Sequence, residues 1–157
     1  MASRPYTGSK DAVHEAKRAG MQVFVDYCCF FFGVKNIGIF VNRGMRSDPT
    51  KKSVHATWRA VDLKGTVEQR KKMVEFLFTH RDILGIEEIH AYDGTGCPLP
   101  NLTKYGAGYR CDRDAWKAWD AKNNGGTPGA DWTHVEVSPA MADNPDAVHA
   151  AFKQALA

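Results

Sequence analysis

The sequence predicts an α+β fold, in which a small and mainly antiparallel sheet is flanked by helices. Two observations carry this prediction. Segments of helical period are mixed along the chain with short segments rich in β-branched and aromatic residues. Long polar loops containing glycine and proline precede two of the predicted strands, which is where sites tend to lie on a rigid sheet. The chain of 157 residues fits one domain, residues 1–157.

The first half of the chain predicts two helices and two strands. Apolar residues at turn-like spacings indicate a helix from Asp11 to about Phe32. A strand at 36–44 follows, then a turn-rich segment, and a second strand at 59–63. The clearest helix is 66–84, because Thr66 is placed to cap it and an apolar stripe runs along one face.

The second half predicts two further strands and two further helices. A strand at 85–92 leads into a long loop through residue 110. Residues 112–123 predict a short helix, with Trp116 and Trp119 three positions apart on its core-facing side. The alternative for the four tryptophans, Trp58, Trp116, Trp119 and Trp132, is that they line a glycan or peptide groove. A strand at 131–139 and a helix at 144–157, with Asn144 before Pro145 at its start, complete the chain.

Composition excludes several classes of protein. The net charge of +3 is mild and dispersed, and no basic run with interleaved aromatics occurs, so nucleic-acid binding is not expected. The most apolar stretch, around Asp26, is too short and too interrupted to span a bilayer, and the first twenty residues lack the apolar core of a signal peptide. The four cysteines form no CxxC pair, which disfavours a four-thiolate zinc site; Cys97 and Cys111 are left as either paired or free.

Three residues form a candidate metal site. His55 and Asp62 lie in the segment SVHATWRAVDL, and His134 lies in DWTHVEV, where a strand would put it on the same face as Trp132 and Glu136. Two histidines and one carboxylate are a ligand set typical of catalytic zinc, because three protein ligands leave a fourth position for water. The sequence therefore predicts Zn²⁺ at this set. Each residue also has an ordinary structural reading: a turn cap for His55, an ion pair with Arg59 for Asp62, and a core histidine for His134.

The wider pattern resembles a known family. SVHATWRAVDL is similar to the S-x-H-x-x-G-x-A-x-D motif of the hedgehog/DD-peptidase superfamily of zinc peptidases, with Trp58 in place of the usual glycine. NRGMRSDPT resembles the family's SGYRS segment and places Arg46 at its substrate-facing arginine. DWTH resembles the family's E-x-x-H, with Asp131 in place of the usual glutamate. The three motifs occur in the family's order between residues 43 and 136.

The resemblance implies a hedgehog/DD-peptidase-like fold and a role for each matched residue. His55, Asp62 and His134 would bind zinc, and Asp131 would move the proton between the metal-bound water and the leaving amine. Arg46 would stabilise the oxyanion or bind a substrate carboxylate. The side chain of Glu136, the rival base, would hold an imidazole in place. His90, on the third predicted strand with Tyr92 on the same face, has two readings: it borders the pocket, or it is a core histidine with satisfied hydrogen bonds, which is the one we expect.

The implied activity is that of a zinc metallopeptidase, a hydrolase of the bacterial peptidoglycan stem peptide. It would be of the D,D-carboxypeptidase or the L-alanyl-D-glutamate endopeptidase type, as in a bacteriophage endolysin or a virion-associated enzyme of cell-wall degradation. Such a protein would be in the host cytoplasm before its release to the wall, or on the virion with other virion or tail proteins as partners. Two alternatives stay open: a catalytically inactive metal-binding module that recognises cell wall within a virion, and a scaffold without metal.

Overall fold

A computed structural model describes residues 3–123 and 127–157. Its centre is a six-stranded sheet in the order β1-β2-β6-β3-β4-β5, in which every neighbouring pair is antiparallel. Its strands are β1 (Lys35–Gly38), β2 (Ala60–Lys64), β3 (Ile86–Ala91), β4 (Ala107–Arg110), β5 (Ala115–Ala118) and β6 (Trp132–Val137). The coarse prediction of an α+β fold with an antiparallel sheet is thereby confirmed.

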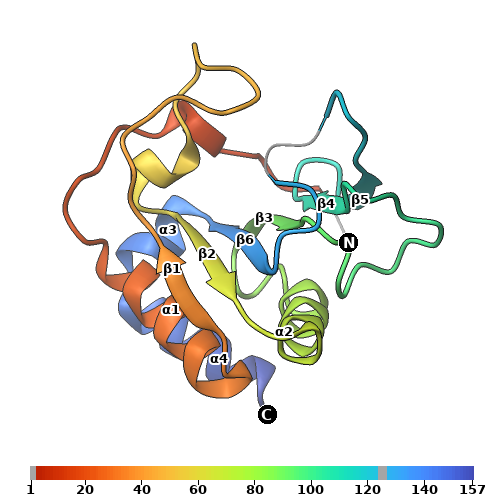
Figure 1. Cartoon of the computed structure of the whole chain (residues 1–157). Coiled ribbons are helices and arrows are strands. Elements are labelled where there is room, and N and C mark those ends of the chain that lie inside the picture. The colour runs from red at the N-terminus through yellow and green to blue at the C-terminus, as the bar shows by residue number, and fades with distance from the viewer. Residues whose placement is uncertain (1–2, 124–126) are drawn as a thin grey trace.

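The helices lie together on one face of this sheet (Figure 1). They are α1 (Ala19–Phe32), α2 (Val67–Thr79), α3 (Pro139–Asp143) and α4 (Pro145–Ala155). The core lies between them and the sheet, where side chains of β2, β3 and β6 such as Leu63, Ile89 and Val135 are fully buried. On the opposite face run the N-terminal segment, with the 3-10 turn η1 (Gly8–Lys10), and the loop from β1 to the short helix η2 (Val54–Thr57). No described helix is long and apolar enough to cross a membrane.

Local sequence explains the best-predicted elements. Thr66 accepts a hydrogen bond from the backbone of Gln69, whose side chain accepts one from the backbone of Thr66, so α2 begins with a complete capping box. Asn144 accepts a hydrogen bond from the backbone of Ala147 and caps α4 ahead of Pro145. These signals depend only on residues within one turn, which is why the sequence reveals them.

Two predicted helical segments are wrong, and two further predicted elements are too long: the helix at 66–84 ends at Thr79, and the strand at 36–44 ends at Gly38. Residues 11–18 are not helical, and α1 begins only at Ala19. The reason is tertiary: Arg18 donates hydrogen bonds to Asp11, Asp143 and the backbone oxygen of Thr57, which hold this segment extended along η2. Ion pairs with distant partners have no signature in local periodicity.

The predicted helix at 112–123 contains a strand instead. Ala115–Ala118 forms β5, which pairs with β4 across a tight turn in which Asp114 has a φ of 43°. A separation of three on a strand puts side chains on opposite faces. Trp116 accordingly packs on Tyr109 and Phe78 in the core, while Trp119 faces the other way. The long predicted loop before this segment also contains β4, because strand pairing extends to its last four residues.

Arg59 connects the N-terminal segment to the sheet. Its side chain is fully buried and pairs with Asp11 and Glu87, and it donates further hydrogen bonds to the backbone oxygens of Gly8 and Val137. Asp62 lies three residues further along and pairs elsewhere, so the sequence-based ion pair between Arg59 and Asp62 is not formed.

Replacing Arg59 with methionine is expected to destabilise the protein by about 3–5 kcal/mol, because the buried Glu87 would lose its cationic partner and keep only its hydrogen bonds from Thr7. Urea denaturation followed by circular dichroism measures the change. Arg110→Met is the matched control, because the Arg110–Asp112 pair is about one-third exposed and should contribute no more than about 1 kcal/mol. Equal stability of the Arg59 variant and wild type would contradict this role.

Candidate metal centre

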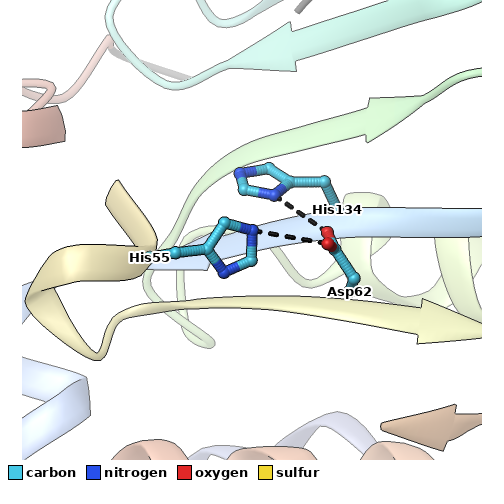
Figure 2. A group of neighbouring side chains, drawn as sticks. All are labelled: His55, Asp62 and His134. Atoms are coloured by element: carbon cyan, nitrogen blue, oxygen red, sulfur yellow. Dashed lines mark hydrogen bonds and ion pairs between the residues drawn. The ribbon is translucent and has the colours of Figure 1, made fainter. Parts of the chain in front are cut away.

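His55, Asp62 and His134 come together on the sheet face away from the helices (Figure 2). One ligand atom from each residue lies within 4.8 Å of the other two. Asp62 lies in the middle of β2, directly opposite His134 on β6, so their side chains share one face. His55 comes from η2, immediately before β2. The three residues that the motif predicts as ligands are thus brought together.

The turn between His55 and Asp62 explains how two residues seven positions apart direct their side chains to the same point. On one regular strand, an odd separation would put them on opposite faces. Ser53 caps η2 by accepting a hydrogen bond from the backbone of His55. Trp58 then ends η2 with a φ of 60°, a left-handed conformation that favours glycine. Trp58 is the position at which the family motif has glycine. The backbone bend therefore keeps the conformation that a glycine would favour, while the Trp58 side chain packs against the core.

Hydrogen bonds fix which nitrogen of each imidazole faces Asp62. Nδ1 of His55 lies 2.7 Å from the backbone oxygen of Ile39, so this nitrogen donates and leaves Nε2 free, 3.5 Å from Asp62. Nε2 of His134 lies 2.9 Å from Oε1 of Glu136, which leaves Nδ1 toward Asp62 at 3.2 Å. Ligand imidazoles in metal sites are held by this kind of outer partner. The set offers His55 Nε2, His134 Nδ1 and an Asp62 oxygen to one ion.

The charges around the group favour a cation. Burial acts to raise the pKa of Asp62, yet hydrogen bonds with His134 and His55 outweigh it and lower the pKa below its ordinary value. Burial acts to lower the pKa of His134, yet its bonds to Asp62 and Glu136 raise that pKa well above the ordinary value. Between two carboxylates the imidazole carries a proton, and a metal ion would have to displace that proton in order to bind. The donor set of two imidazoles and one carboxylate fits zinc.

The N-terminal segment contacts Glu136, the carboxylate that holds His134, through the side chain of Tyr6. The hydroxyl of Tyr6 lies 2.8 Å from Glu136 and 3.0 Å from Glu88. One hydroxyl proton cannot serve two carboxylates, so one carboxyl must supply a proton of its own. Burial and the neighbouring Glu136 raise the pKa of Glu88 to about 7, which makes Glu88 the group that can do so. Tyr6 and Glu88 were missed in the sequence. A signal for Glu88 is that Glu88, His90 and Tyr92, the last of them just after β3, alternate with the buried apolar residues Ile89 and Ala91.

The group lies in a cleft of about 840 Å³. Cationic side chains at its edge include Arg46, the arginine of the motif, together with Arg43 and Lys51 from the same loop, Lys10 and Arg110. Aromatic side chains also line the cleft, among them Trp119 and Trp132, while Trp58 and Trp116 pack on the core instead. The cleft therefore combines a cationic edge with a ring-lined wall, and the candidate metal group lies in it.

Asp131 does not join the group. Its carboxylate lies 3.4 Å from the ammonium of Lys64, more than half exposed, beside a separate surface depression. Alternation along β6 puts Trp132, His134 and Glu136 on the cleft face, and a residue one step before Trp132 on the other. In the motif comparison Asp131 replaces a glutamate, so its side chain is one methylene shorter and must start closer to a metal-bound water. The strand geometry instead points this side chain away from the cleft. Its role as the base stays a prediction that requires the backbone before β6 to turn.

All four cysteines are free thiols, so Cys97 and Cys111 are not joined. Comparison of the chain with models of known protein families, with curated proteins and with solved structures finds no match.

Proposed function

We propose that this protein is a zinc-dependent peptidase that hydrolyses a bond of the bacterial peptidoglycan stem peptide. The observation that carries the proposal is the His55–Asp62–His134 group in its cleft, with the free nitrogen of each imidazole already oriented toward the carboxylate. Three such ligands suit a catalytic ion because a fourth position is left for water. The match of three motifs to the hedgehog/DD-peptidase superfamily supports the same reading and the finer fold that goes with it.

Each residue of the cleft has a defined task in this proposal. Zinc, when bound, supplies a water of lowered pKa and polarises the scissile carbonyl. His55 and His134 hold the ion as neutral imidazoles, and Ile39 and Glu136 keep them in the correct tautomer. Arg46, exposed at the cleft edge, binds the developing oxyanion or a substrate carboxylate with its planar donor group.

The charge of the cleft edge fits this substrate. Stem peptides carry free carboxylates, and Arg43, Arg46 and Lys51 present three cations on one loop. In a narrow cleft, charges of one sign concentrate ligands of the other. By this proposal the protein acts at the cell wall as a phage lysin or as a virion-associated hydrolase.

A catalytically inactive metal-binding module is the second candidate, and one observation favours it. Asp131, the residue that matches the family's proton shuttle, pairs with Lys64 outside the cleft. Glu136 does not replace it in this geometry, because it contacts the far nitrogen of His134 rather than the one that faces Asp62. Such a module would bind zinc and cell wall within a virion without cutting.

The direct test is incubation of the zinc-loaded protein with purified peptidoglycan and with soluble muropeptides, followed by mass spectrometry of the products. We expect new amino termini in the stem peptide, loss of cleavage with a chelator, and recovery when zinc is added back. Asp62→Ala is expected to cut nothing, whereas His149→Ala, an exposed histidine on α4, should cut as wild type does. Bound zinc without any new amino terminus would favour the inactive module.

A further inference from the structure

His90 is a third histidine beside the candidate metal group, and the proposed reaction gives it no task. It lies on β3 directly opposite His134, so both side chains are on the cleft face. The residue is only 4% exposed, and within the described part of the chain its Nε2 has no hydrogen-bond partner. A buried polar atom left unpaired destabilises a protein, so a partner from outside the chain is expected.

Aromatic rings continue from His90 in both directions along the cleft wall. The imidazole stacks on Tyr92 at 4.1 Å between ring centroids and lies 5.2 Å from the indole of Trp119. Tyr92 in turn meets Trp132 edge-on at 6.0 Å. All four residues line the cleft. We call Trp119, His90, Tyr92 and Trp132 the aromatic row.

The position of Trp119 is fixed by a glycine. Gly108 on β4 pairs with His90, and a Cβ built on Gly108 would lie 2.4 Å from the Cζ2 atom of Trp119. The indole therefore lies directly on a backbone that has no side chain. The Nε1 of Trp119 is also buried and, among the described residues, has no hydrogen-bond partner. The row thus contains two unsatisfied ring nitrogens next to each other.

The chemistry of the row selects its ligand. An indole N–H can only donate, so the ligand must present an acceptor oxygen to Trp119, and an apolar ligand would leave both nitrogens unpaired. A sugar hydroxyl can donate and accept, and so satisfies His90 in either tautomer. The C–H face of a pyranose ring is apolar and flat enough to pack on an indole. A sugar therefore meets both requirements, the apolar wall and the unpaired nitrogens.

We propose that the aromatic row is a sugar-binding subsite that takes a pyranose ring of the glycan to which the stem peptide is attached. This proposal rests on the proposed function for the identity of the substrate. It adds that the aromatic row binds the glycan part of that substrate. Neighbouring strands are about 4.8 Å apart, and an extended peptide advances about 3.4 Å per residue. With His90 and His134 on adjacent strands, the sugar lies within one or two residues of the bond at the metal. The protein accordingly prefers stem-peptide bonds close to the glycan.

The first experiment measures sugar binding without hydrolysis. Tri-N-acetylchitotriose is titrated into the zinc-loaded full chain and followed by NMR, where we expect the indole N–H signal of Trp119 to shift. Trp119→Ala is expected to weaken binding about tenfold or more, since it removes the stacking contact. His90→Phe keeps a ring but removes both nitrogens, and should weaken binding as well.

Two glycines provide a matched pair of variants. Gly108→Ala should weaken sugar binding because the added methyl group displaces the indole. Gly38 is the other glycine on a sheet strand near the group: it lies on β1 and pairs with Asp62. A Cβ built on Gly38 meets nothing within 4 Å. Gly38→Ala should therefore bind the sugar as wild type does. Circular dichroism of both variants checks that they fold. Sugar binding by folded Gly108→Ala at wild-type strength would overturn the proposed subsite.

The second experiment compares a glycan-bearing muropeptide with the same peptide lacking its sugar. We expect kcat/KM of the wild type to be at least about tenfold higher for the glycan-bearing form, and Trp119→Ala to bring the ratio close to one. Cleavage of both at equal rates by a wild type that binds no sugar would overturn the subsite and leave the peptidase intact. Sugar binding without any cleavage would support the sugar subsite and contradict the proposed peptidase activity.

Discussion

Alanine in place of His55 or His134 is expected to abolish stoichiometric zinc binding, with an affinity loss of more than about 100-fold. Changes to residues that merely support a ligand already cost about 10–100-fold, and removal of a ligand should cost more. Glu136→Gln, which keeps the contact to His134 but loses its charge, is expected within that smaller range. Elemental analysis of the dialysed proteins, together with competition against a chromogenic chelator, measures both quantities.

His149→Ala is the control for the loss of a histidine, because His149 is exposed on α4 and contacts Tyr27 rather than the cleft. His55 is buried, so circular dichroism must confirm that its variant folds. If folded His55→Ala or His134→Ala still bound one zinc ion per chain, the zinc ligands would be other residues.

Arg46→Ala is expected to keep both fold and zinc and to lower the hydrolysis of stem peptides by about 10²–10³-fold. A donor that stabilises an oxyanion contributes that much to the rate. The side chain of Arg46 is exposed at the cleft edge, so its removal leaves no buried group unpaired. Initial rates on a defined muropeptide, with zinc content determined on the same samples, measure the effect.

Lys52→Ala is the matched control, since Lys52 is an exposed cation of the same loop that bonds to Asn42 and does not line the cleft. A general loss of positive charge would slow both variants equally. Hydrolysis at the wild-type rate by the Arg46 variant would show that Arg46 does not contribute to the reaction.

Local signals in the sequence predicted the parts of the fold that depend on near neighbours. Thr66 with Gln69 marks the start of α2, and the β-branched runs mark β2, β3 and β6. The candidate ligands were also found from sequence, since motif spacing places His55 and Asp62 on either side of one bend. Each of these inferences needs only residues that are close in the chain or that match an ordered set of motifs.

Features that depend on distant partners were not predicted. Pairing with β4 converts residues 115–118 from the expected helix into a strand, and hydrogen bonds to Asp143 keep Arg18 outside a helix. His90 was expected to be satisfied in the core, and only the position of β3 beside β6 reveals an imidazole without a partner in the described chain. The orientation of Asp131 follows from where β6 begins, which the sequence leaves undetermined by a residue or two.

We expect His55, Asp62 and His134 to hold one catalytic zinc ion. The most direct measurement is a crystal structure of the zinc-loaded protein with anomalous diffraction recorded on both sides of the zinc absorption edge. We expect one strong anomalous peak per chain, about 2.0–2.2 Å from Nε2 of His55, Nδ1 of His134 and a carboxylate oxygen of Asp62. A zinc-loaded crystal with no anomalous peak among these three residues would contradict it.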